Sequence, residues 1–246
     1  MSHPFRPPPP RLTADAALFL DFDGTLVELA ESPDAIRVPE ELRALLGRLA
    51  ATLDGRLAVI SGRSIADLDR YLPGAGIAMS GSHGIELRAP DGTCAPLAPP
   101  PGLETARAEI DRFAARHPGL LVETKPASVA LHYRKAPACA EDAAALVAEI
   151  AGRTGLSVQP GKMVLELRPR GADKGDALRK MMTEPPFAGA RPWFVGDDLT
   201  DEDAFAAAAE LGGAGVLAGP PRDTAARWRL DGVAAVVAWL EGAVRG

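Results

Sequence analysis

Two aspartates, Asp21 and Asp23, end an apolar run in the stretch "LFLDFDGTLVEL" at residues 18–29. On a strand, residues i and i+2 point to the same side, so the two carboxylates emerge together. Two such charges about 4 Å apart repel each other by about 4 kcal/mol at an effective dielectric constant of about 20, and a divalent cation relieves that repulsion. Mg²⁺ fits this pair because it binds one or two carboxylates together with phosphate and water. The alternative is a capped turn whose aspartates are incidental.

A second acidic cluster follows a second apolar run, in the stretch "WFVGDDLTDEDAF" at residues 193–205. Asp197 and Asp198 come directly after this run, and Asp201 follows one helical turn later. In an open parallel sheet, ligands bind at the edge formed by the carboxyl ends of the strands. If the two runs are neighbours, the two clusters hold one metal ion between them. The alternative is a solvated helix start, where the helix dipole favours acidic residues. It applies mainly to Asp201, Glu202 and Asp203.

Groups that bind phosphate stand near the ends of the same elements. They are small, hydroxyl-bearing or cationic residues in the stretches "DGT", "SGR" and "DKG": Gly24, Thr25, Ser61, Gly62, Arg63 and Lys174. Lys174 opens a helical segment, where backbone amides face an anion. The alternatives are a turn or capping role for Ser61 and a solvated side chain for Lys174.

These residues need a sheet that brings them together, and the flanking pattern predicts one. Apolar runs without alternation, typical of strands buried on both faces, stand at residues 16–22, 55–63 and 76–84. Helical spacing at residues 38–53 and 64–72 separates them. Later segments add strand, loop and helix at residues 191–211, a short strand at 214–219 and a closing helix at 232–244. The alternation predicts an α/β fold with a doubly wound, mostly parallel sheet covered by helices.

The middle of the chain has a different order, typical of an inserted α+β domain. Helical spacing at residues 101–117 and 137–155 alternates with strand pairs at residues 119–135 and 156–169. Such pairs predict an antiparallel sheet backed by two helices. We place the insertion at residues 88–168 and the core at residues 13–87 and 169–246. Residues 1–12 are a proline-rich leader that we expect to be disordered.

Composition and charge argue against several classes of protein. The chain of 246 residues has a formal net charge of −6, which argues against a broad nucleic-acid surface. No apolar run reaches about 18 residues, so we expect no membrane span. The leader lacks an apolar signal core, and we expect a cytoplasmic protein. Cys94 and Cys139 have no metal-like spacing, and no segment indicates an obligate protein partner.

Four motifs in a fixed order resemble those of the haloacid dehalogenase (HAD) superfamily of phosphatases. They are DFDGT, SGR, DKG and GDDLTDEDAF, which together span residues 21–205. In this superfamily, an insertion between SGR and DKG corresponds to a cap domain of the C2 type. Within the superfamily the sequence is similar to the trehalose-6-phosphate phosphatase family, through "SGSHGIE", "VETKPASVALHYR" and "GKMVLELRP". The resemblance implies Mg²⁺-dependent hydrolysis of trehalose 6-phosphate to trehalose and inorganic phosphate, the final step of trehalose biosynthesis.

The resemblance also implies a role for each residue of the core motifs. Asp21 is expected to be the nucleophile that forms an aspartyl-phosphate, and Asp23 the general acid and base. Mg²⁺ is expected to bind the carboxylates of Asp21 and Asp197 and the backbone carbonyl of Asp23. Asp198 and Asp201 are expected to hold metal-bound waters and the catalytic lysine. The phosphoryl oxygens are expected to contact Lys174, Ser61, Gly24, Thr25 and Gly62.

Each strand of the insertion has one apolar and one polar face. Alternation places Glu123 and Lys125 on one face of their strand, and Lys162 and Glu166 on one face of another. The alternative is a polar face that is only solvated. By the resemblance, cap lysines and glutamates contact the sugar, and for His83 a turn or hinge role is the alternative. The expected substrate-binding residues are Arg63, His83, Glu123, Lys125, Arg134, Lys162 and Glu166.

Three other functions share parts of this pattern. A related sugar phosphatase acting on sucrose 6-phosphate or mannosyl-3-phosphoglycerate has the same core motifs and differs in its cap. A phosphomutase also has a DxDGT strand, but it requires an activating bisphosphate and releases no inorganic phosphate. A non-catalytic sugar-phosphate-binding module would lack a motif residue, and none is missing here.

Overall fold

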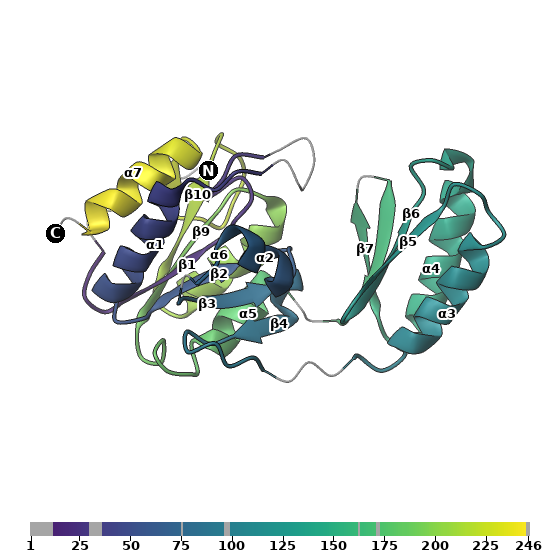
Figure 1. Cartoon of the computed structure of the whole chain (residues 1–246), viewed down its shortest axis with the longest axis horizontal. Coiled ribbons are helices and arrows are strands. Elements are labelled where there is room, and N and C mark those ends of the chain that lie inside the picture. The colour runs from purple at the N-terminus through teal and green to yellow at the C-terminus, as the bar shows by residue number, and fades with distance from the viewer. Residues whose placement is uncertain are drawn as a thin grey trace. The chain divides into compact units, whose positions relative to one another are not determined.

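The structure is a computed structural model that describes residues 12–29, 36–74, 76–95, 99–161, 163–170 and 173–244. It divides into a core unit, Met1–Ala95 with Asp173–Gly246, and an inserted unit, Pro96–Ala172 (Figure 1). The sequence placed the insertion at residues 88–168, but residues 86–88 pair with the core sheet. The predicted leader at residues 1–12 lies outside the described residues except for Leu12. None of the helices in the described ranges is long and apolar enough to cross a lipid bilayer.

The core unit is built on a seven-stranded sheet with the strand order β11-β10-β9-β1-β2-β3-β4. All neighbours pair in parallel except β4, which runs antiparallel to β3 at one edge. The prediction of a doubly wound, mostly parallel sheet is therefore confirmed. The strands are β1 (Ala16–Leu20), β2 (Leu57–Ile60), β3 (Ala78–Gly81), β4 (Glu86–Arg88), β9 (Arg191–Gly196), β10 (Ala214–Ala218) and β11 (Trp228–Leu230).

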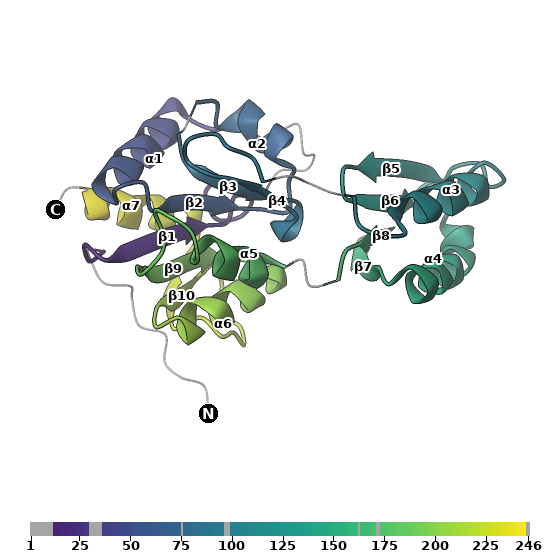
Figure 2. The ribbon, with the colours of Figure 1, turned by 90° about the horizontal axis from the view of Figure 1, so that it is seen from below.

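Helices cover both faces of this sheet, as Figure 2 shows. Leu18 and Leu20 of β1 belong to the hydrophobic core on one face, and Phe19 belongs to the core on the other face. Because β1 is buried on both faces, its sequence is apolar without alternation. The first face is covered by α1 (Glu40–Thr52), α2 (Ile65–Tyr71) and α7 (Val233–Val244), and the second by α5 (Lys174–Met181) and α6 (Glu202–Glu210).

Two short strands and one turn of the core unit differ from the sequence prediction. The strands β4 and β11 are each three residues long, too short to leave a periodic pattern. The strand expected at residues 76–84 stops at Gly81, and the chain continues through a 3-10 turn at Ser82–Gly84. This turn lies against the predicted site and is described with it below.

The inserted unit is a four-stranded antiparallel sheet, as predicted, and its strand order is β5-β6-β8-β7. Its two helices cover one face, where Val129, Leu131 and Leu167 are buried in a core of their own. This confirms the apolar face expected from alternation. The elements are α3 (Leu103–Ala114), β5 (Leu121–Lys125), β6 (Ser128–His132), α4 (Ala140–Thr154), β7 (Ser157–Gly161) and β8 (Val164–Arg168).

Two residues next to strand ends of the inserted unit lie in turns. Arg134 lies in the turn after β6, and Met163 lies in the tight connection between β7 and β8, with a φ of 64°. A positive φ is typical of hairpin turns, so Met163 does not continue the strand alternation of β8. Lys162, expected on the polar face, lies outside the described residues.

Candidate active site

The carboxyl ends of β1 and β9 lie side by side because the two strands pair in parallel. Leu20 stands opposite Val195, and the backbone amide of Asp21 donates to the carbonyl of Val195 at 2.9 Å. Asp21 and Asp197 therefore leave the sheet at the same edge, although they are far apart in the sequence. One carboxylate oxygen each from Asp21, Asp197 and Asp201 lies within 4.8 Å of the others.

The turn after β1 requires a glycine at position 24. Gly24 has a φ of +77°, and a Cβ built there would overlap the carboxylate of Asp197. Left-handed backbone and close approach are both reasons for glycine. Thr25 is buried, and its Oγ1 donates to Asp197 Oδ1 at 3.1 Å. The "DGT" turn therefore holds the second acidic cluster in place.

Lys174 is the first residue of α5, and its ammonium group is buried between two carboxylates. Its Nζ lies 2.8 Å from Asp21 Oδ1 and 2.6 Å from Asp201 Oδ1. Helix α5 begins here because Asp173 caps it, with its Oδ1 accepting from the amide of Asp176 at 2.8 Å. The other oxygen of Asp201 accepts from the amide of Asp198 at 2.9 Å. The DFD, DKG and GDD motifs thus form one connected cluster.

Burial and charge shift the pKa values within this cluster. Burial raises the pKa of Asp21 to about 8, with the charge of Asp201 adding to the rise and Lys174 opposing it. Burial also raises the pKa of Asp197 to about 6, and the charge of Asp201 again adds to it. Burial lowers the pKa of Lys174, but the charges of Asp21 and Asp201 outweigh this effect, and the net shift is upward. Three carboxylates facing one ammonium leave an excess of negative charge.

This donor set fits a hard divalent cation such as Mg²⁺, which prefers carboxylate, carbonyl and water oxygens. Both oxygens of Asp201 already accept hydrogen bonds, from Lys174 and from the amide of Asp198. Asp21 and Asp197 are therefore the carboxylates better placed to be direct ligands. This geometry is consistent with the expectation that Asp201 holds Lys174. The carbonyl of Asp23 as a metal ligand stays a prediction.

The "SGR" loop follows β2 and carries Ser61 and Arg63 to the same edge of the sheet. Ser61 is 1% exposed, and its Oγ accepts from the amide of Arg63 at 3.2 Å. The guanidinium of Arg63 donates to both carboxylate oxygens of Asp23, from Nε at 2.6 Å and from Nη2 at 2.8 Å. Arg63, expected from the sequence to contact substrate, is thus paired with the residue expected to be the general acid and base.

His83 lies in a turn with unusual backbone conformation beside the "SGR" loop. Ser82 and His83 have φ values of 51° and 56°, a region that residues other than glycine rarely adopt. The amide of His83 donates to the carbonyl of Ser61 at 3.0 Å, and Ser82 Oγ donates to Glu86 at 2.5 Å. A Cβ at Gly62 would lie 2.6 Å from His83 Nε2. The imidazole therefore packs on Gly62, and the glycine of the motif is needed for this close approach.

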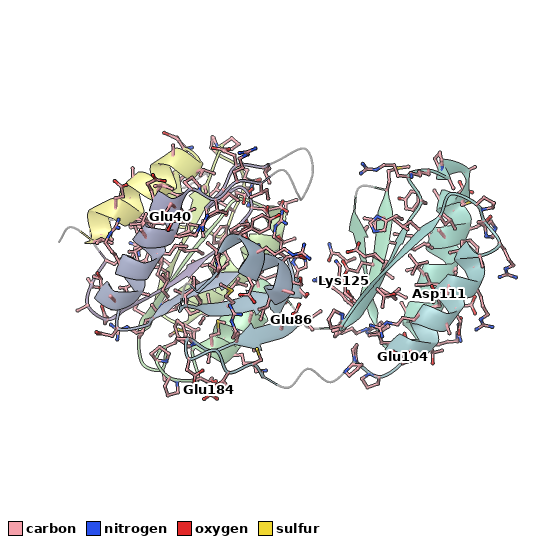
Figure 3. All side chains as sticks on the ribbon, viewed as in Figure 1. Glu40, Glu86, Glu104, Asp111, Lys125 and Glu184 are labelled. Atoms are coloured by element: carbon pink, nitrogen blue, oxygen red, sulfur yellow. The ribbon has the colours of Figure 1, made fainter. Side chains whose placement is uncertain are left out.

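The polar face of the inserted unit carries an ion-pair network centred on Lys125, which Figure 3 labels. Its Nζ lies 3.2 Å from Glu166 Oε1 and 4.0 Å from Glu123 Oε1. Glu123 also pairs with His132 at 2.9 Å, and Glu166 accepts from Ser128 Oγ at 2.5 Å. Three expected substrate-binding residues, Glu123, Lys125 and Glu166, are therefore joined. Arg134, beyond the end of β6, is exposed.

One cation at the core site has no counterpart in the motifs. Arg222 follows β10 and donates to the backbone carbonyls of Asp198 at 2.7 Å and Asp197 at 3.4 Å. It also pairs with Glu202 at the start of α6. Arg222 thereby fixes the backbone that carries the second acidic cluster. Sequence reasoning missed it because a lone arginine in "GPPRD" belongs to no recognisable pattern.

Comparison with known proteins shows the family. The family model described as trehalose-phosphatase matches residues 19–233. The chain belongs to the trehalose-phosphatase family. It is therefore an enzyme, a phosphoric monoester hydrolase.

Two relatives are similar to this family member over most of their length. A probable trehalose-phosphate phosphatase of Sinorhizobium fredii is 43% identical over 83% of this chain and 78% of the relative. The trehalose-6-phosphate phosphatase of Escherichia coli is 40% identical over 94% of this chain and 88% of the relative.

Solved structures agree on the fold. The trehalose-6-phosphate phosphatase of Aspergillus fumigatus matches with a TM-score of 0.70 and 26% identity, over 94% of this chain and 93% of that chain. A HAD-superfamily phosphatase of Bacteroides thetaiotaomicron matches with a TM-score of 0.61 and 18% identity, over 90% and 91% of the two chains. The HAD-like fold predicted from the motifs is therefore confirmed.

Proposed function

We propose that this trehalose-phosphatase hydrolyses trehalose 6-phosphate to trehalose and inorganic phosphate in two steps, with Asp21 as the nucleophile. The observation that carries the proposal is the buried Asp21–Lys174–Asp201 cluster beside Asp197 at the carboxyl end of β1. A lysine ammonium within 2.8 Å of the Asp21 carboxylate holds that carboxylate in one orientation. A fixed orientation favours in-line attack on phosphorus, which depends mainly on positioning.

In the first step, a carboxylate oxygen of Asp21 forms a bond to phosphorus, and the bond between phosphorus and the sugar oxygen breaks. The leaving sugar oxygen takes a proton from the carboxyl group of Asp23. The products of this step are trehalose and an aspartyl-phosphate. Asp23 stands two residues after Asp21, in the segment that follows β1, and its side chain is partly exposed, which suits a proton donor to the leaving group.

In the second step, water attacks the phosphorus of the aspartyl-phosphate and gives a proton to Asp23. The bond between phosphorus and the Asp21 oxygen breaks, which releases inorganic phosphate and restores both carboxyl groups to their starting state. A phosphomutase would instead return the phosphoryl group to a sugar oxygen.

The other residues of the core site hold the phosphoryl group and the metal. Mg²⁺ would bind to the carboxylates of Asp21 and Asp197 and the carbonyl of Asp23, where it would neutralise negative charge on the phosphoryl oxygens. Asp198 and Asp201 would act through metal-bound waters and Lys174. The groups that contact the phosphoryl oxygens are Lys174, Ser61, Thr25 and the amides at Gly24 and Gly62.

The polar face of the inserted unit is the proposed recognition surface for the sugar. Glu123, Lys125 and Glu166 present donors and acceptors that sugar hydroxyls match. These side chains already bind one another, so they are held in place before a sugar arrives, which reduces the entropy lost on binding. Arg134, Lys162 and His83 complete the proposed set of sugar contacts.

Phosphate release from a panel of substrates tests this function. The panel is trehalose 6-phosphate, sucrose 6-phosphate, glucose 6-phosphate and mannosyl-3-phosphoglycerate, each with Mg²⁺ and with EDTA. We expect Mg²⁺-dependent release from trehalose 6-phosphate, lost in Asp21→Asn and retained in the control Asp111→Asn, an exposed aspartate on α3 labelled in Figure 3. Preference for another sugar phosphate would overturn the substrate assignment, and activity in Asp21→Asn would overturn the mechanism.

A further inference from the structure

The pair between Arg63 and Asp23 is a strong contact of the proposed acid and base that the sequence motifs do not predict. Nε and Nη2 of Arg63 each donate to a different oxygen of Asp23, at 2.6 Å and 2.8 Å. Two parallel hydrogen bonds from a planar guanidinium define the plane of a carboxylate as well as its position. A lysine at this place would supply charge at one point and would leave the carboxylate free to rotate.

Arg63 is itself held in place from several directions. Its guanidinium carbon lies 5.3 Å from the ring centroid of Tyr71 and 5.8 Å from that of Phe22. Its backbone amide donates to Ser61 Oγ at 3.2 Å, and its carbonyl accepts from the amide of Ser82 at 2.7 Å. The side chain is 16% exposed, against 28% for Asp23. An arginine held by two rings and by backbone contacts is suited to orient a neighbour and would lose these contacts by extending toward a substrate.

From this geometry we propose that Arg63 is a positioning residue for Asp23 and does not itself bind the sugar. This inference rests on the proposed function, because it assigns Asp23 the proton transfers of both steps. Arg63 sets the direction of the Asp23 carboxyl, first toward the leaving sugar oxygen and then toward the attacking water. Removal of Arg63 should therefore slow proton transfer and leave substrate affinity unchanged.

A comparison of two leaving groups separates this role from a structural one. The sugar oxygen of trehalose 6-phosphate needs a proton as it leaves, whereas p-nitrophenolate leaves without one. In Arg63→Met, p-nitrophenyl phosphate should still phosphorylate Asp21 quickly, but water should attack the aspartyl-phosphate slowly. We expect a rapid burst of about one p-nitrophenolate per active site followed by slow turnover, because positioned proton transfer contributes a factor of about 100 or more.

With trehalose 6-phosphate, Arg63→Met should lower kcat by about 100-fold and change KM by less than about threefold, as expected for an interaction made only in the transition state. Arg63→Lys keeps the charge and loses the two-point contact, so we expect it to stay at least about tenfold below the native kcat. Arg88→Met is the matched control, because Arg88 also forms a two-point ion pair, in which its Nη1 and Nη2 each lie 2.8 Å from a different carboxylate oxygen of Asp69. It should retain native kinetics.

Three results would overturn the inference. One is a raised KM with unchanged kcat in Arg63→Met, which would make Arg63 a substrate ligand. Another is an equal loss with both substrates and no burst, which would indicate a disturbed site. The third result applies if Arg63→Met does not fold, and it is full activity in Arg63→Lys. Failure of the proposed function itself would be visible separately, as absence of Asp21-dependent phosphate release by the native enzyme.

Discussion

Gly24→Ala tests whether the turn after β1 holds the second acidic cluster. A Cβ at position 24 overlaps the carboxylate of Asp197. Asp197 would therefore have to move, and it would lose its 3.1 Å hydrogen bond from Thr25. We expect loss of both Mg²⁺ affinity and activity from a change of one methyl group.

The expected loss of stability in Gly24→Ala has one contribution from the backbone and one from the lost contact. At a φ of +77°, left-handed backbone costs an alanine about 1–2 kcal/mol. The lower entropy of the unfolded chain offsets about 0.4–1 kcal/mol of this backbone cost. Loss of a hydrogen bond to a charged group adds about 1.5–3 kcal/mol. A displacement of about 1 Å in a catalytic group costs about 100-fold in rate, so we expect kcat/KM to fall by at least that factor.

Gly212→Ala is the matched control for this substitution. Gly212 has a φ of +80°, and a Cβ added there would meet no atom within 4 Å, so the change carries the backbone cost without the collision. We expect its melting temperature to fall by about 2–4 °C and its kinetics to stay native. The assay is phosphate release at increasing Mg²⁺ concentration, together with calorimetric titration of Mg²⁺ into each variant.

The comparison between the two glycine variants decides whether the turn after β1 holds Asp197. If Gly24→Ala lost only as much stability as Gly212→Ala and kept native Mg²⁺ affinity, Asp197 would not depend on the turn. The account of "DGT" as a support for the second cluster would then be refuted.

Three further predictions concern other parts of the molecule. Arg222→Ala should weaken Mg²⁺ binding by about tenfold in calorimetry, because the carbonyls of Asp197 and Asp198 lose their donor; native affinity would contradict this. Metal-free protein should lose thermal stability as the pH rises from about 4 toward 8. Burial raises the pKa of Asp197 to about 6 and that of Asp21 to about 8, so in this range only the folded state holds those protons. Mg²⁺ should remove this loss of stability, and a melting temperature that rises with pH over this range would contradict the prediction. Lys125→Met should raise KM for trehalose 6-phosphate by about tenfold or more and leave p-nitrophenyl phosphate turnover unchanged, since its ion pairs with Glu166 and Glu123 lie in the proposed sugar surface; equal effects on both substrates would place Lys125 outside sugar recognition.

Much of the core fold follows from local patterns. The strand at residues 16–20 is buried on both faces, as its unbroken apolar sequence predicts. Helical spacing identified α1 and α2 within a few residues. The short strands β4 and β11 were missed because three residues are too few to show a period.

The candidate site was predictable wherever chemistry demands a particular residue at a strand end. Asp21, Asp197 and Lys174 belong to motifs, and the structure brings them together as expected. Arg222 and the pairing of Arg63 with Asp23 were not predictable, because neither leaves a local pattern. The left-handed turn at Ser82 and His83 was also hidden, since a positive φ is uncommon for any residue other than glycine.

The sequence by itself determined the order of the longer elements of the core and the residue types gathered at each strand end. Periodicity and turn chemistry are properties of neighbouring residues, so they can be read without coordinates. Only the tertiary structure decided the individual contacts that these charges make. Lys174 bridges Asp21 and Asp201, and Arg63 orients Asp23, because parallel strands from distant segments end at one edge of the sheet. An ion pair depends on distance in space, and sequence separation carries almost no information about that distance.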